Sequence, residues 1–250
     1  EKRMDKALQN PNIPLMMRGH YTDKGNSVRG AIMHLSSSES TQYLRLFNGG
    51  EEKFDKVILD VYTAVYLSLM GFTPSVVNLN LEVVLCHQTK KVLESWIEDI
   101  LRDDYMSMGV SEQGMYRITS EDIQRDCLDL IQGLKTLLEY AKVEALKPAD
   151  TPELLVKIRD MVDETVYSTF QLSVANDIPL LCIDHLMIEL AHRSGCPAAN
   201  MNSFVERALN SLSLKERKKS IQFNLFSGTP VSILYQDIME LSQSSEPDDT

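Results

Sequence analysis

Short apolar runs alternate with amphipathic segments through most of this chain. Runs of strand length occur at residues 57–59, 81–85 and 179–183. Apolar side chains recur at helical spacing within residues 63–70, 88–102, 120–147, 151–176 and 185–193. Strands separated by helices imply parallel pairing through right-handed crossovers. The pattern therefore predicts an α/β fold with a mainly parallel sheet and many helices.

The two ends of the chain carry a different pattern. Residues 1–52 are rich in turn signals between short apolar stretches, and they are predicted to form an amino-terminal segment or linker with a few short strands. Residues 53–241 form the main predicted domain, with a polar loop expected at 103–117 and further helices at 203–212 and 214–226. Residues 242–250 are acidic and are predicted to be a disordered tail.

Charge and composition narrow the classes of function. The formal net charge of −11 argues against an extensive basic surface for nucleic acid, so any such partner must be held locally. The four cysteines show no Cys-x-x-Cys spacing, which favours reduced thiols in a cytosol. No apolar stretch is long enough to span a membrane. We therefore expect a soluble, cytoplasmic protein with no membrane partner.

Two of the predicted strands end in an aspartate. Asp60 follows the first apolar run, and Asp184 follows the third. If these strands are neighbours, both carboxylates lie at one rim of the sheet, where ligands of open α/β folds bind. Glu94, in the helix after the second strand, can face the same rim. Such a cluster needs a cation, and hard oxygen ligands suit Mg²⁺ or Mn²⁺, which support hydrolysis of phosphodiesters.

Each of these acids also has a simpler interpretation. Asp60 and Asp184 can cap the helices that follow them, and Glu94 can be a solvated helix residue. Among the five histidines, His185 and His192 are close in sequence but are separated by two helical turns, which disfavours a zinc site. Residues 215–219 contain a basic cluster that is either a solvated helix face or a contact for RNA.

The acidic motifs also resemble those of a known family. The segment Val57-Ile58-Leu59-Asp60, the helix with Glu94, and the run from Ile178 to Asp184 are similar to the successive motifs of PIN-domain ribonucleases. More narrowly, residues 54–241 resemble PIN-like domains at the carboxyl ends of large bacterial conflict and phage-defence proteins.

This resemblance implies a fold and an activity. The fold would be a three-layer α/β/α arrangement, and the activity would be that of an endoribonuclease dependent on Mg²⁺ or Mn²⁺. Asp60, Glu94 and Asp184 would be the metal ligands. The substrate would be RNA, in single-stranded form, and the module would act as a toxin-like effector in antiviral defence, beside other domains of a larger protein or as an oligomer.

The chain departs from the family pattern at two positions. Tyr62 stands where a Ser or Thr is usual, although Thr63 follows it. The usual third acid aligns with Ser168, and the nearest acids are Asp163 and Glu164, of which Glu164 is our candidate for a fourth catalytic carboxylate. These departures leave open a second interpretation, in which a PIN-like domain without turnover serves as a binding or assembly module.

Overall fold

A four-stranded parallel sheet organises the protein. The computed structural model describes residues 10, 12–22, 25–36, 45–111, 114–227 and 235–243. Within them, β1 (Lys56–Leu59), β2 (Glu82–Leu85), β5 (Lys142–Val143) and β6 (Leu180–Leu181) pair in the order β5-β2-β1-β6. The predicted parallel sheet is confirmed, and the strands that precede Asp60 and Asp184 are neighbours.

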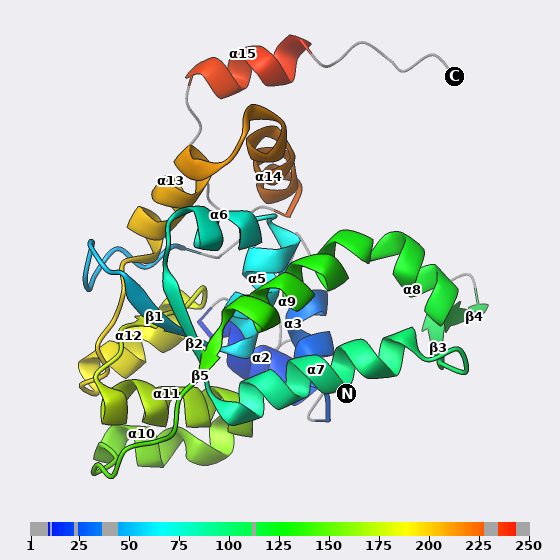
Figure 1. Cartoon of the computed structure of the whole chain (residues 1–250). Helices are drawn as coiled ribbons and strands as arrows, with labels where there is room; N and C mark the ends of the chain where they lie inside the picture. Colours follow the sequence, from blue (N-terminus) through cyan, green and yellow to red (C-terminus); the bar gives the residue numbers. More distant parts are fainter. Residues whose placement is uncertain are drawn as a thin grey trace.

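Helices cover both faces of this sheet, which confirms the expected α/β/α layers (Figure 1). The helices α5 (Val61–Leu69), α6 (Thr73–Asn78) and α7 (His87–Leu101) follow the first two strands. They are followed by α9 (Leu128–Tyr140), α10 (Glu153–Ile158), a 3₁₀ turn (Arg159–Met161), α11 (Glu164–Asn176) and α12 (His185–Arg193). The carboxyl-terminal helices are α13 (Met201–Ser211), α14 (Leu214–Ser227) and α15 (Tyr235–Gln243). The central strand β1 is apolar on both faces because Val57, Ile58 and Leu59 are all buried.

The amino-terminal segment contains helices instead of the predicted strands. The helices α2 (Leu15–Thr22) and α3 (Ser27–Leu35) replace them, so the expectation of short strands is wrong for the described part of residues 1–52. The turn signal at Asn26 is a helix cap, because its side chain accepts a hydrogen bond from the backbone of Arg29 at 2.9 Å. Helix α3 packs on α5 and buries its apolar side, and α2 packs on α3 and α12. The division of the chain at residues 52 and 241 stays a prediction.

Three further expectations need correction. The predicted loop at 103–117 contains a hairpin of β3 (Met106–Ser111) and β4 (Gly114–Thr119). The single helix predicted at 120–147 is interrupted at Cys127 between α8 (Ser120–Asp126) and α9, and it ends at Tyr140. The chain then turns extended and pairs β5 with β2, so sheet pairing overrides helix propensity there. Ser242 and Gln243 of the predicted tail belong to α15, and residues 244–250 lie outside the described residues.

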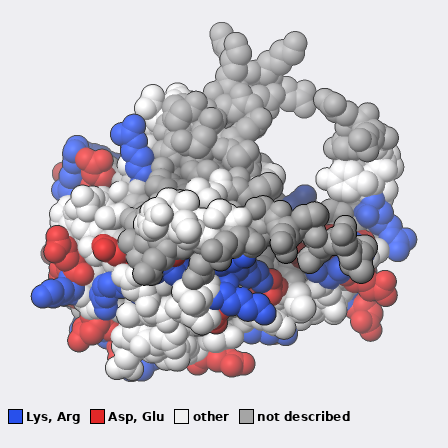
Figure 2. Space-filling view, turned by 90° about the horizontal axis from the view of Figure 1, so that it is seen from above, with Lys and Arg blue, Asp and Glu red and all other residues white. Residues whose placement is uncertain are grey.

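Charged side chains of both signs are interleaved on the surface. Figure 2 shows Lys and Arg beside Asp and Glu over the face that it presents, without a continuous field of one sign among the residues drawn in colour. In the described part of the chain, no helix is long and apolar enough to cross a membrane.

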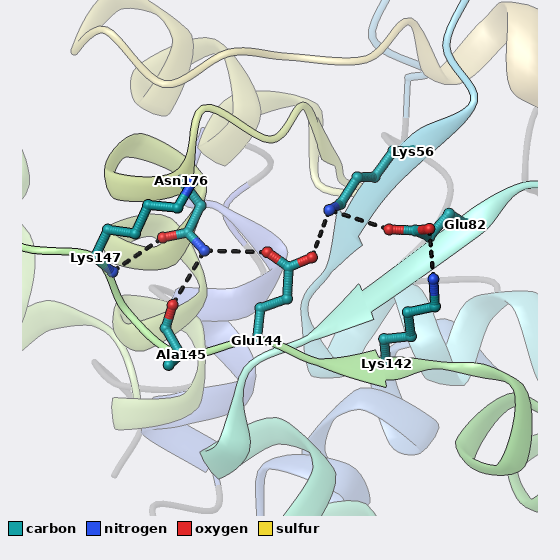
Figure 3. A network of polar contacts seen from close by, with 7 residues as sticks. All are labelled: Lys56, Glu82, Lys142, Glu144, Ala145, Lys147 and Asn176. Atoms are coloured by element: carbon teal, nitrogen blue, oxygen red, sulfur yellow. Dashed lines mark hydrogen bonds and ion pairs between the residues drawn. The ribbon is translucent and has the colours of Figure 1, made fainter.

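A polar network joins the amino ends of three strands (Figure 3). Lys56 of β1 forms ion pairs with Glu82 of β2, at 3.0 Å, and with Glu144, which follows β5. Lys142 of β5 pairs with the other oxygen of Glu82 at 2.6 Å. Asn176, at the end of α11, donates to Glu144 at 3.1 Å. This network holds the strands together at the end of the sheet opposite to Asp60 and Asp184.

We predict that Lys56→Met lowers the free energy of unfolding by about 0.5–1 kcal/mol, because Glu82 and Glu144 then lose their shared cation while both side chains remain partly accessible to solvent. Urea unfolding measures the change, and high salt should reduce it because the charges are screened. Lys157→Met is the matched control, since it breaks a more exposed lysine pair with Glu153 on α10. Equal losses in the two variants would contradict a special role for the network.

Candidate active site at the carboxyl ends of the strands

Asp60 lies directly after β1 and is fully buried. It caps α5, because its Oδ1 accepts a hydrogen bond from the backbone N–H of Thr63 at 2.9 Å. Its Oδ2 accepts a second hydrogen bond from the hydroxyl of Thr63, also at 2.9 Å. The expected strand-to-helix position of this carboxylate is confirmed, and so is the helix-capping interpretation.

Thr63 links the two aspartates. Besides donating to Asp60, its Oγ1 accepts a hydrogen bond at 3.1 Å from the backbone N–H of Ile183, the residue before Asp184. The family pattern led us to expect a Ser or Thr hydroxyl two residues after Asp60, where this chain has Tyr62. Thr63 supplies it three residues later, from the third position of the helix that Asp60 caps. The spacing Asp-x-x-Thr is the sequence signal for this interaction.

Asp184 is buried and caps two helices at once. Its Oδ1 accepts from the backbone N–H of Met187 in α12 at 3.3 Å. Its Oδ2 accepts from the backbone N–H of Met16 in the first turn of α2 at 2.8 Å. The second contact joins residues far apart in the chain, and no sequence pattern indicates it.

Tyr62 lies beside this contact. Its side chain is fully buried, and its hydroxyl donates to the backbone carbonyl of Met16 at 3.5 Å. Helix α2 approaches it at Gly19, where a Cβ atom would lie 1.5 Å from the Tyr62 hydroxyl. Helix α2 therefore packs directly against Tyr62 and Asp184 at the rim.

Burial governs the ionisation of both aspartates. It raises the pKa of Asp60 to about 6, and hydrogen bonds from Thr63 and from the Cys182 thiol oppose the rise. Burial also raises the pKa of Asp184, and the backbone donors Met16 and Met187 together with the electrostatic effects of His185 and Arg18 oppose the rise. The charge of Asp60 therefore costs the fold free energy at neutral pH.

The acids before α11 are arranged differently from our expectation. Glu164 is exposed in the first turn of α11. Asp163 caps that helix through Oδ1, which accepts from Thr165 at 3.0 Å, while its Oδ2 is buried without a hydrogen-bond partner. Burial raises the pKa of Tyr62, and so do the charges of Asp163, Asp184 and Asp60, so that phenol lies within electrostatic range of all three carboxylates. The helix-capping position before α11 was the sequence signal that favours Asp163.

Glu94 lies on the expected helix but on its exposed side. The side chain keeps 48% of its area exposed and forms an ion pair with Lys90 of the same helix at 3.6 Å. The structure brings Asp60 and Asp184 to one rim and does not bring Glu94 into contact with either of them.

The chemistry of these donors fits a hard divalent cation, but their present spacing does not. Asp60, Asp184 and the unpartnered Oδ2 of Asp163 are carboxylate oxygens of the kind that Mg²⁺ and Mn²⁺ prefer. Among the residues that the structure describes, however, no three His, Cys, Asp or Glu side chains lie close enough together to hold a metal ion. In this conformation the oxygens of Asp60 and Asp184 accept hydrogen bonds from the protein instead.

A family model matches the part of the chain that contains the candidate site. Residues 58–193, more than half of the chain, match the family model described as a PIN domain associated with the TPR-GreAB-C-PIN system. No curated protein and no solved structure matches the chain. The matched range contains Asp60, Glu94, Asp163, Glu164 and Asp184, and it begins after α2 and α3.

We predict that Asp60→Asn stabilises the fold at neutral pH. The pKa of Asp60 rises from 3.8 to about 6 on folding, so the native state binds more protons than the unfolded state between these pH values. The free energy of unfolding therefore falls as the pH rises from about 4 to about 6, and it stays lower at higher pH. At pH 7.5 this difference amounts to about 3 kcal/mol, and an uncharged Asn should recover most of it, because the backbone N–H of Thr63 keeps its acceptor and the hydroxyl of Thr63 loses its own. The gain should shrink towards pH 4.

Urea unfolding at several pH values measures this difference. Asp177→Asn is the matched control, since Asp177 is exposed and its left-handed backbone suits Asn. A loss of stability in Asp60→Asn at pH 7.5 would contradict the cost of burial that we assign to Asp60.

Proposed function

The chain belongs to the family of PIN domains associated with the TPR-GreAB-C-PIN system, and from this premise we propose that it is a metal-dependent endoribonuclease whose site is the rim at Asp60 and Asp184. One observation carries the proposal. The pairing of β1 with β6 brings two buried aspartates to the same end of the sheet, and Thr63 bonds to one of them and to the backbone before the other. Ionisable groups with perturbed pKa values gather at functional sites.

The residues of the rim have distinct roles in this proposal. Asp60 and Asp184 would hold Mg²⁺ or Mn²⁺, with Thr63 fixing the orientation of Asp60. Asp163 is our preferred third carboxylate, because its buried Oδ2 lacks a partner. Glu94 and Glu164 stay candidates for a conformation in which their exposed side chains turn towards the rim. When bound, the divalent ion would activate water and stabilise the leaving oxygen of a phosphodiester.

The substrate in this proposal is RNA held over a short contact. The net charge of −11 and the interleaved charges of Figure 2 do not support a long basic track for a duplex. A single strand bends into a local site more readily than a duplex does. The family description names a system with other components, and we propose that this module works in the cytoplasm as a toxin-like effector of defence within such an assembly.

A second function is favoured by the same rim. Every oxygen of Asp60 and Asp184 accepts a hydrogen bond from the protein, and Glu94 points to solvent. A PIN domain that binds or assembles without turnover would have such a satisfied, closed rim. Activity measurements separate the two candidates.

We predict that the purified protein cleaves labelled single-stranded RNA in millimolar Mn²⁺, and that Asp184→Asn lowers the rate at least about 100-fold, because one of the two carboxylates proposed to hold the cation is lost. Asp177→Asn is the control for the same chemical change away from the rim, and it should keep the rate of the wild type. Full activity in Asp184→Asn would place the cleavage elsewhere or in a contaminant. RNA binding without cleavage in all three proteins would favour the assembly module.

A further inference from the structure

The amino end of helix α2 is hydrogen-bonded to Asp184, a carboxylate that the proposed function needs for the cation. The N–H group of Met16 lies in the first turn of the eight-residue α2 and donates to Oδ2 of Asp184 at 2.8 Å. The first backbone N–H groups of a helix have no partner within it, and the helix dipole makes this end positive. Asp184 thereby receives from α2 the kind of stabilisation that a cation would give.

Arg18 adds a formal positive charge to this contact. It is buried, with 5% of its area exposed, and it belongs to the same helix. Burial lowers the pKa of Arg18, and the nearby acidic groups of Asp184 and Tyr62 partly oppose this lowering. A cation carried by α2 therefore partly balances the negative charge of the rim.

The position of α2 against Tyr62 depends on the absence of a side chain at Gly19. A Cβ atom there would lie 1.5 Å from the hydroxyl and 2.6 Å from Cζ of Tyr62, which is a rigid and fully buried side chain. On the other side, a Cβ atom at Gly30 of α3 would lie 3.2 Å from the carbonyl oxygen of Gly19. A methyl group added at Gly19 is therefore incompatible with the observed position of α2.

Helix α2 keeps its position through its tertiary contacts. Helices as short as eight residues are not stable by themselves in water, so α2 depends on its tertiary contacts. Short elements of this kind open locally at a lower free energy than the core of the sheet. Both α2 and α3 lie before residue 58, where the match to the family begins.

From these contacts we propose that α2 is an inhibitory cap, which competes with a divalent cation for Asp184 and keeps the site closed. The proposal rests on the proposed function, since it describes the regulation of the same site. In the closed state the backbone N–H of Met16 satisfies Oδ2 of Asp184 and the charge of Arg18 acts on it, and in the open state the cation would take their place. The fraction of open molecules then sets the apparent affinity for the cation.

The sharpest test is Gly19→Ala, which should displace α2 from Tyr62. We expect the apparent dissociation constant for Mn²⁺ alone, measured from the free-ion signal in electron paramagnetic resonance, to fall at least about tenfold relative to the wild type. Gly133→Ala is the matched control, because it adds the same methyl group where α9 crosses α5, 3.0 Å from Cβ of Ser68. The control should bind Mn²⁺ as the wild type does.

A second variant protects the test against misfolding of the first. Arg18→Met keeps most of the packing volume and removes the positive charge, so it too should bind Mn²⁺ more tightly. Hydrogen–deuterium exchange of the wild type supplies an independent measurement. Adding Mn²⁺ should speed the exchange of the amide protons of α2, that of Met16 included, because the cation and the cap exclude each other.

The outcomes separate the cap from the function. Tighter binding in Gly19→Ala or Arg18→Met, with faster exchange in α2, supports the cap. Equal Mn²⁺ affinity in the wild type and both variants, with loss of binding in Asp184→Asn, overturns the cap and leaves the metal site intact. Absence of Mn²⁺ binding in every protein overturns the proposed function, and the cap falls with it.

Discussion

The burial of two carboxylates at one rim is the constraint on which the rest of the structure depends. Neither Asp60 nor Asp184 can be solvated, so each needs hydrogen-bond donors from the protein. Thr63 meets this need for Asp60 and also fixes the backbone before Asp184. The Oδ2 of Asp184 accepts a hydrogen bond from the backbone N–H of Met16 in α2, which is far away in the sequence. The amino-terminal helices are therefore held against the sheet partly by the electrostatic requirement of the site.

The strand and helix pattern predicted the parts of the fold that depend on local periodicity. Residues 57–59 and 180–181 are fully buried in β1 and β6, as their apolar runs predicted. The adjacency of β1 and β6 was a condition of the predicted site that the sequence did not determine, because the two strands are not consecutive. The short strand β5 could not be predicted, because Lys142 and Val143 lie at the end of a strongly helical pattern and become extended only by pairing with β2. The helices α2 and α3 were hidden by turn residues such as Asn26, which turned out to cap a helix.

The candidate site was predictable to the extent that strand ends define it. Asp60 and Asp184 follow from position alone, whereas the other acids depend on which way a side chain points. Glu94 and Glu164 have suitable places in the sequence and yet are exposed, while Asp163 is turned inward by its role as a helix cap. The contact between α2 and Asp184 could not be predicted, because its donor is a backbone N–H group, which nearly every residue type has. Only glycine can approach Tyr62 as Gly19 does, but a glycine in a sequence fits a turn or a helix end equally well.

The chemistry of helix caps bears on whether these carboxylates serve the fold or a function. Asn is about as good a capping residue as Asp, so capping α5 alone does not require charge. Charge is nevertheless costly here, since burial raises the pKa of Asp60 to about 6 and that of Asp184 as well. An Asn at position 60 would keep the hydrogen bond from the backbone N–H of Thr63. At position 184 both carboxylate oxygens accept from backbone N–H groups, those of Met16 and Met187, so only a carboxylate satisfies both. The two backbone donors therefore account for the carboxylate of Asp184, whereas the charge of Asp60 exceeds what its cap requires and supports the proposal of a site that receives positive charge.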